Sequence, residues 1–279
     1  MISVLTFNKD IPKSAFKRAI NRFKSNNIES SILIVDKVKL CHVKFIQKTN
    51  KVPWKKIKSK FGEDIDNILC KPNVYLPIEY GFSRYNSILF MRRLCENAAL
   101  VALEKAKVSK TKLKISLYDP RCAHHDMAEL LLPYCCELKI ITNNVSFYEK
   151  EIFRLNQEYS TPICVSDLVC NIHPCNIIIS PDKIKKKLKM NATTIVFTSE
   201  KPVVKLDGLV YYDYKVALPK KFKELECLDL KNECLLSALY DKENDYQLGS
   251  IVPNYCVING SMVSLQKVCK NIEQLSNNF

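Results

Sequence analysis

Short apolar runs alternate with helical patterns along residues 112–198. The runs are KISLYDP, LKIITNN, PICVSD, NIIISPD and TTIVFTS, and the helical patterns among them are AELLLPYC, SFYEKEIFRLNQEY and IKKKLK. Nearly continuous apolar strands that alternate with helices are typical of a parallel sheet covered by helices on both faces. Right-handed crossovers restrict the order of its strands further. We therefore predict an α/β domain over residues 112–217.

A smaller α+β lobe is predicted to precede this domain, over residues 1–85. The runs SVLTF, SILIV and KLCHVKFI have the composition of strands, and Ala15–Phe23 repeats apolar residues at helical spacing. A turn at Asp36 and Lys37 joins the last two strands into a hairpin. A long helical pattern over residues 86–111 then connects this lobe to the α/β domain.

The C-terminal part is predicted to be a helical extension over residues 218–279 that packs back on the lobes. The strand GLVYYDYKV precedes the extension, which contains helical patterns over Glu233–Tyr240 and Met262–Leu275.

Composition narrows the class of protein. Hydrophobic residues make up 47% of the chain and charged residues 26%, the balance of an ordinary folded protein. The chain has no run of about 18 apolar residues, which a membrane-spanning helix needs, and MISVLTFNKD is too briefly apolar for a secretory signal. Most of the 13 cysteines lie in apolar periodic segments, as reduced core residues do. We expect a cytoplasmic protein without a membrane partner.

The chain carries a formal charge of +14, which raises the question of nucleic-acid binding. Its densest basic run, DKIKKKLK, places Ile184 and Leu188 four residues apart and the lysines between them, as on a solvated helix face. Aromatic residues that could stack on bases are absent from the run. Nucleic acid is therefore the less favoured partner, and the segment 182–189 is predicted to be a helix.

At KISLYDP, preceded by the long helix and followed by LKIITNN and NIIISPD, the chain resembles the Rossmann-like NAD(P)-binding superfamily, with a two-domain layout similar to shikimate dehydrogenase. The resemblance covers roughly residues 86–200. It implies that Asn143 and Asn144 lie where that superfamily binds the ribose of the cofactor, and that Ser180, Pro181 and Asp182 lie beside its nicotinamide ring. NAD(P) is the cofactor that it implies.

The first turn departs from that superfamily, because it contains no glycine. The G-x-G-x-x-G fingerprint lets backbone amides approach the diphosphate, whereas the turn here runs DPRCAHHD, from Asp119 to Asp126. Only five glycines occur in 279 residues, against a usual share of about 7%. A dinucleotide held in the standard way is therefore disfavoured.

The same turn could bind a smaller anion. Arg121 could clamp it, while His124 and His125 could add charge beside the amides of a helix N-terminus. The opposing interpretation is that Asp126 caps the helix, with Glu129 completing a capping box. Both interpretations stay open.

The turn also carries the candidate catalytic groups. His124 or His125 could act as a general acid or base with Asp119 orienting it, and an exposed, inert loop is the alternative. The candidate ligand contacts are Asp119, Arg121, Cys122, Asn143, Asn144 and Ser180.

Other motifs carry less chemistry. CNIHPC, with Cys170, His173 and Cys175, has three zinc-type ligands rather than four, so we expect no metal. No nucleophile elbow or Walker-type phosphate loop occurs. The stretch from Glu79 to Tyr85, which includes Tyr80 and Arg84, could face the cleft between the lobes.

Taken together, these patterns predict a Rossmann-like parallel sheet with helices on both faces and a smaller N-terminal α+β lobe. The leading functional hypothesis is that it binds a small anionic metabolite or an altered nucleotide in the cleft between the lobes, with or without catalysis. The alternatives are an NAD(P)-dependent oxidoreductase and a basic nucleic-acid-binding module. Self-association into a homo-oligomer stays open.

Overall fold

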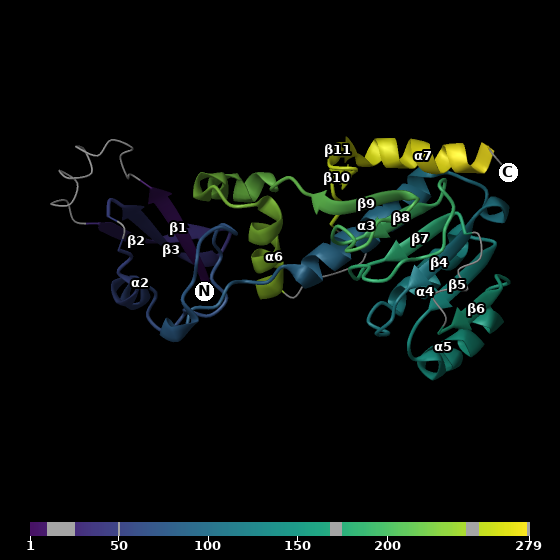
Figure 1. The fold of residues 1–279 in the computed structure, drawn as a ribbon, viewed down its shortest axis with the longest axis horizontal. Coiled ribbons are helices and arrows are strands. Elements are labelled where there is room, and N and C mark those ends of the chain that lie inside the picture. The colour runs from purple at the N-terminus through teal and green to yellow at the C-terminus, as the bar shows by residue number, and fades with distance from the viewer. Residues whose placement is uncertain (10–25, 50, 168–174, 244–250, 278–279) are drawn as a thin grey trace. The chain divides into compact units, whose positions relative to one another are not determined.

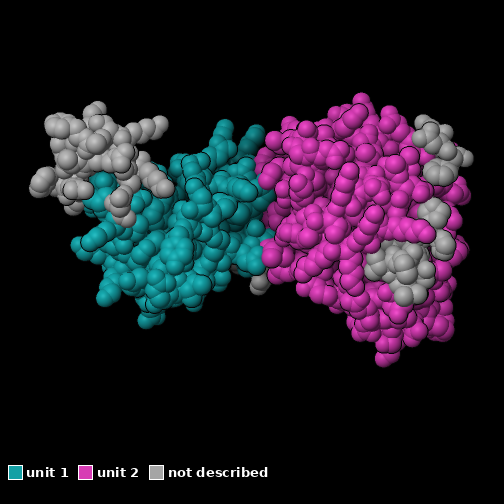
Figure 2. Space-filling model, viewed as in Figure 1, with its two compact units in different colours: residues 1–87, 218–245 teal, residues 88–217, 246–279 magenta. Residues whose placement is uncertain are grey.

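The computed structural model describes residues 1–9, 26–49, 51–167, 175–243 and 251–277. Two compact units make up the chain (Figure 1 and Figure 2): unit 1 is 1–87 with 218–245, and unit 2 is 88–217 with 246–279. Residues 218–279, expected as one extension, are divided between the units. The expected helix Ala15–Phe23, and Cys170 and His173 of CNIHPC, lie outside the described residues.

Unit 1 is built on a three-stranded sheet in the order β1-β3-β2. Its strands are β1 (Ile2–Lys9), β2 (Asn27–Val35) and β3 (Val38–Gln47), with β1 parallel and β2 antiparallel to β3. Asp36 and Lys37 both have positive φ, 45° and 67°, as a two-residue hairpin turn of the favoured type requires. The predicted hairpin is confirmed.

Helices complete unit 1. Those in the described part of the unit are α2 (Trp54–Phe61), α6 (Asn232–Glu243) and the 3₁₀ segments Ile78–Tyr80 and Lys220–Leu228. α2 buries Ile57 and Phe61 in a cluster with Leu5, Val43 and Phe45 on one face of the sheet. The unit thus has its own core, in an α+β arrangement.

Unit 2 contains an eight-stranded sheet in the order β11-β10-β9-β8-β7-β4-β5-β6. Its strands are β4 (Lys114–Tyr118), β5 (Glu137–Ile141), β6 (Ile163–Ser166), β7 (Ile177–Ser180), β8 (Ile195–Thr198), β9 (Leu209–Lys215), β10 (Tyr255–Ile258) and β11 (Ser261–Ser264). The six from β4 to β9 are parallel to one another, and counted along the chain they lie in the order 3-2-1-4-5-6. This is the strand order of the Rossmann fold.

Within the described residues, the helices that flank this sheet are α3 (Ile88–Ala106), α4 (Asp126–Leu131), α5 (Val145–Glu158) and α7 (Leu265–Asn277) (Figure 1). The 3₁₀ turns Lys110–Lys112 and Leu132–Tyr134 follow α3 and α4, respectively. α3 packs against β7, β8, β9 and α7, and its buried alanines Ala98, Ala99 and Ala102 permit a close approach. The predicted long helix, parallel strands and Rossmann-like α/β class are confirmed.

The lysine-rich segment after β7 is not the helix that its spacing predicts. Residues 181–194 are irregular, because their backbone bonds to neighbouring segments: Ser180 and Thr198 donate their hydroxyls to the carbonyl of Asp182, and Val203 donates its amide to Ile184. Ile184 and Leu188 are nevertheless buried, against Ile178 and Val196 of the sheet. Their predicted burial is correct, and the predicted helical conformation is wrong.

The C-terminus adds a hairpin that the sequence analysis missed. β10 and β11 are joined by Asn259 and Gly260, whose φ angles are 50° and 79°. Met262, expected to begin the last helix, lies in β11, and α7 begins at Leu265. Asn-Gly is the strongest short-range hairpin signal, so the dipeptide Asn259–Gly260 is enough to predict this hairpin from the sequence.

Candidate functional site

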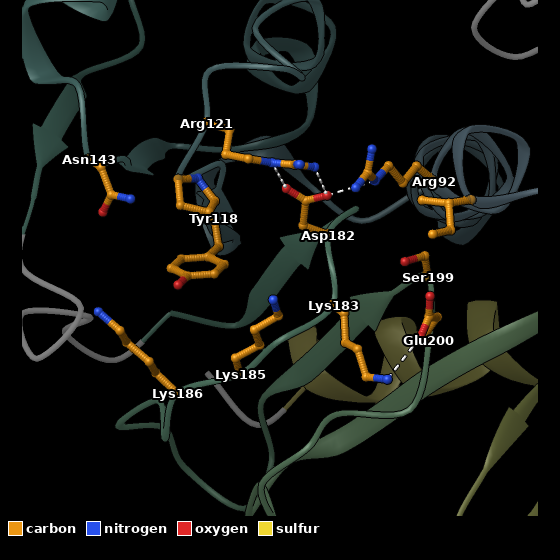
Figure 3. Close-up of a pocket in the computed structure, with 12 residues that line it drawn as sticks. Arg92, Tyr118, Arg121, Asn143, Asp182, Lys183, Lys185, Lys186, Ser199 and Glu200 are labelled. Atoms are coloured by element: carbon orange, nitrogen blue, oxygen red, sulfur yellow. Dashed lines mark hydrogen bonds and ion pairs between the residues drawn. The ribbon is translucent and has the colours of Figure 1, made fainter. Parts of the chain in front are cut away.

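A pocket of about 370 Å³ lies at the carboxyl ends of β4 and β7 in unit 2 (Figure 3). These strands are adjacent, and the chain leaves them toward opposite sides of the sheet, which makes this the switch point where open α/β sheets bind ligands. The pocket is lined by Ile88, Arg92, Tyr118, Pro120, Arg121, Asn143, Asp182, Lys183, Lys185, Lys186, Ser199 and Glu200.

Asp182 is the centre of one side of this pocket. Arg121 binds its carboxylate with two bonds, of 3.0 and 2.6 Å, and Arg92 from α3 adds an ion pair at 2.6 Å (Figure 3). Burial by itself raises the pKa of Asp182, but His124 and the two arginines outweigh it and hold the pKa at about 2. Asp182 is therefore a fixed anion that positions two guanidinium groups.

His124, whose exposed fraction is 5%, is a buried neighbour of Asp182. Its Nδ1 is 2.5 Å from Oε1 of Glu96 on α3, and its Nε2 is 3.9 Å from Oδ1 of Asp182. Burial by itself lowers the pKa of His124, but the two carboxylates outweigh it and raise the pKa to about 9. His124 is thus a protonated bridge between α3 and the segment after β7.

Asp119 holds the turn after β4 together. Its buried carboxylate accepts the amides of Ala123 at 3.0 Å and His124 at 2.8 Å, and the hydroxyl of Tyr148 at 2.7 Å. Asp119 binds the backbone of His124 rather than its ring, so the expected pairing of Asp119 with a histidine ring does not occur in this arrangement.

This geometry does not fit the diphosphate of a dinucleotide. The amides that would meet a phosphate in a glycine-rich turn are directed at the carboxylate of Asp119. The turn contains one left-handed residue, Cys122 with φ of 55°, but it carries a side chain that approaches Thr142 at 3.2 Å. The carboxylate of Asp119 therefore takes the place that a bound phosphate would have in a glycine-rich turn.

The other sequence-predicted contacts are scattered. Arg121 and Asn143 line the switch-point pocket, whereas Ser180 is buried and bonded to the backbone of Asp182. Asn144 caps α5 by accepting the amide of Phe147 at 3.3 Å, and the exposed His125 packs edge-on against that phenylalanine.

The predicted capping of α4 by Asp126 is wrong. The helix begins at Asp126 itself and has no side-chain cap. Asp126 pairs instead with Arg93 at 3.3 Å, and Glu129, the expected partner in a capping box, pairs with Arg154 at 2.6 Å. Because Asp119 already accepts the amides that precede the helix, a second carboxylate is not needed there.

The remaining candidates lie elsewhere. Arg84 in unit 1 donates to the carbonyl oxygens of Cys70, Lys71 and Val74, which makes it an organiser of that loop. Within the described residues no group of three or more His, Cys, Asp or Glu side chains has the geometry of a metal site. Nor does any helix in the described ranges have the length and apolarity to cross a bilayer.

The pocket carries a formal excess of three positive charges, from five basic side chains and two carboxylates. Asp182 pairs with Arg92 and Arg121, and Glu200 pairs with Lys183 at 2.9 Å. Lys185 and Lys186 have no ion-pair or hydrogen-bond partner among the described residues. From the sequence alone, these lysines are expected on the solvated face of a helix. They directly follow β7, the strand at which the strand order of the sheet reverses, and that position is the feature that points to a pocket.

The chain is a two-unit α/β protein whose second unit is Rossmann-like, as its strand order shows. No protein-family model and no curated protein matches it.

Solved structures that align with it include L-tryptophan dehydrogenase from Nostoc punctiforme, at 8% identity and a TM-score of 0.34 over 99% of this chain and 79% of that one. Ligand-free 5-ketofructose reductase of Gluconobacter sp. strain CHM43 aligns at 10% identity, with a TM-score of 0.32 over 98% of both chains. A shikimate dehydrogenase in complex with NADP⁺ aligns at 13%, with a TM-score of 0.30 over 98% of this chain and 95% of that one. Scores this low carry no information about chemistry.

Proposed function

We propose that unit 2 binds a small anionic organic ligand in the switch-point pocket. The observation that carries the proposal is the pair of lysines, Lys185 and Lys186, that line the pocket without a carboxylate partner among the described residues. Ammonium groups gathered in a concave site attract an anion more strongly than they do on a flat surface, because the low-dielectric walls focus the field.

The rest of the pocket supports a binding role. Its arginines are held in place by Asp182, which is itself 7% exposed and held by ion pairs. Tyr118 and Pro120 provide an apolar wall for the organic part of a ligand. The arginine side of the pocket is therefore pre-organised, whereas a ligand still has to order the side chains of Lys185 and Lys186.

The test compares two double variants of the same segment. Lys185→Gln/Lys186→Gln should weaken binding of inorganic phosphate, glycerol 3-phosphate and succinate by roughly tenfold or more, because two ion pairs of about 1 kcal/mol each are lost. Isothermal titration calorimetry measures the affinities.

The matched control is Lys187→Gln/Lys189→Gln, which removes the same charge from neighbouring exposed positions that do not line the pocket. It should change the affinities less than twofold at a fixed ionic strength. Equal losses in both variants would show that only the net charge of the protein matters, and the proposal would fail.

Dinucleotides should not bind the turn after β4. In Lys185→Gln/Lys186→Gln, which removes the two lysines of the pocket, millimolar NAD(H) or NADP(H) should leave the melting temperature unchanged, because Asp119 already accepts the amides that a diphosphate needs. A thermal-shift measurement decides this, and a concentration-dependent rise that survives in Lys185→Gln/Lys186→Gln would restore the oxidoreductase alternative.

A further inference from the structure

The polar groups of the switch-point pocket fall into two sets. On one side, Arg92 and Arg121 are paired with Asp182, and Lys183 is paired with Glu200. The other side holds Lys185, Lys186, Tyr118 and Asn143, whose side-chain polar groups have no hydrogen-bond partner among the described residues. Figure 3 shows these four on one side of the pocket, with the hydroxyl of Tyr118 between the two ammonium groups in this view.

This second set consists almost entirely of donors. Two ammonium groups, a phenolic hydroxyl and an amide NH₂ can all donate, and the carboxylates of the pocket are already paired on the other side. A ligand group that satisfies this set must present several acceptor oxygens and close to two negative charges. Asn143 follows β5, Tyr118 ends β4 and the lysines belong to the segment after β7, so three segments contribute donors to this pocket.

The charge of the set discriminates between the common biological anions. A single carboxylate carries one negative charge and two oxygens, which leaves one ammonium group without a partner, and a dicarboxylate such as succinate meets both ammonium groups only with two groups held apart. A phosphate monoester carries −1.5 to −2 charges at pH 7 and three strong acceptor oxygens, which matches two ammonium groups and two neutral donors.

We propose that the ligand of the switch-point pocket is a phosphate monoester of a small metabolite, whose phosphoryl group contacts Lys185, Lys186, Tyr118 and Asn143. This inference rests on the proposed function, that the pocket binds a small anion. The phosphoryl group is held by side chains on one side of the pocket, and the turn after β4, filled by Asp119, takes no part in holding it.

The first experiment compares ligands at pH 7.5. Glycerol 3-phosphate should bind wild-type protein at least fivefold more tightly than succinate or glycerol, and Lys185→Gln/Lys186→Gln should remove the difference. Tyr118→Phe, which keeps the ring and removes only the hydroxyl, should weaken glycerol 3-phosphate roughly threefold to tenfold, since about 1 kcal/mol of hydrogen bonding is lost. The melting temperature of this variant, measured without ligand, tells a lost contact from a damaged fold.

The second experiment uses the charge of the ligand as the readout. The second pKa of a phosphate monoester is about 6, so lowering the pH from 7.5 to 5.5 should weaken glycerol 3-phosphate about fourfold, whereas sulfate keeps its charge and should not change. The groups that face the phosphoryl position are Lys185, Lys186, Tyr118 and, across the pocket, the Arg121–Asp182 pair. Burial and Asp182 raise the pKa of Tyr118, and Asp182, with its pKa of about 2, stays ionised throughout.

The outcomes separate the two proposals. If succinate binds as tightly as glycerol 3-phosphate and both depend on Lys185 and Lys186, the pocket binds anions but the phosphate inference is wrong. If sulfate matches glycerol 3-phosphate and shows the same pH response, the inference is also overturned. If no anion binds, or if Lys187→Gln/Lys189→Gln removes binding equally, the proposed function itself fails.

Discussion

Replacing Asp119 by alanine should lower the free energy of unfolding of unit 2 by about 3–5 kcal/mol. The substitution removes the acceptor of three hydrogen bonds, from the amides of Ala123 and His124 and from the hydroxyl of Tyr148, and hydrogen bonds to a charged group contribute about 1.5–3 kcal/mol each before the turn relaxes. Tyr148 is fully buried, so its hydroxyl would lose its partner without gaining water. Urea unfolding followed by circular dichroism measures the change.

Two further variants show whether the carboxylate acts as described. Asp119→Asn keeps one carbonyl oxygen and should lose roughly half as much stability as Asp119→Ala. Asp126→Ala, which removes a half-exposed carboxylate with a single pairing to Arg93, should cost no more than about 1 kcal/mol. If Asp119→Ala is no more harmful than Asp126→Ala, then Asp119 does not hold the turn and our account of the missing glycines is wrong.

In the turn after β4, the sequence correctly predicts a poor fit for a diphosphate, but it gives only part of the physical reason. The absence of glycine and the presence of Pro120 indicate that side chains crowd the position of a diphosphate, yet the observed geometry is more specific. Asp119 folds back onto the amides, and this could be anticipated from an aspartate that immediately follows a buried strand, because aspartate readily bonds backbone amides a few residues further on.

The fold was predictable wherever periodicity was strong. The long helix α3 and the apolar strands β4 to β9 are self-evident in the pattern of buried residues, and their alternation limits the sheet to few topologies. The segment after β7 was not predictable in this way, because Ile184 and Leu188 satisfy a helical spacing and an irregular crossover equally well. What decides between them is tertiary: the hydroxyls of Ser180 and Thr198 bind the carbonyl of Asp182.

The site was only partly predictable, because its charges come from segments distant in sequence. Arg121 and Asn143 stand at the ends of predicted strands, so their position at the switch point follows from the strand order. Arg92 and Glu96 lie on α3, and a helix with both apolar and charged residues gives no hint of which charges face inward. In the sequence, the lysines of residues 183–189 form only a run of positive charge. Because β7 lies beside β4, Lys185 and Lys186 of this run line the pocket.

His124 should make the stability of the protein depend on pH between about 6.5 and 9. Its pKa of about 9 in the folded state is above its ordinary value of 6.5, so the folded state binds the proton more tightly than the unfolded state does. The resulting stabilisation is fully present below pH 6.5 and is lost as the pH rises through 9. A shift of this size corresponds to about 3 kcal/mol, which is an order-of-magnitude value.

Urea unfolding of the wild type and of His124→Gln at pH values from 6 to 9.5 measures this contribution as the difference between the two profiles. Burial raises the pKa of thiols such as those of Cys95, Cys135 and Cys256, so both proteins lose stability towards the upper end of the range, and only the loss that is specific to the wild type belongs to His124. His42 in unit 1 does not interfere, since burial and Lys44 lower its pKa and move its titration below the window. Glu96→Gln should narrow the pH window over which stability is lost, because only Asp182, 3.9 Å from Nε2, and Asp119 would then raise the pKa of His124. If the free energy of unfolding changes with pH in the same way for the wild type and for His124→Gln, the imidazole is neutral in the folded protein. His124 then does not join Glu96 and Asp182 through a positive charge.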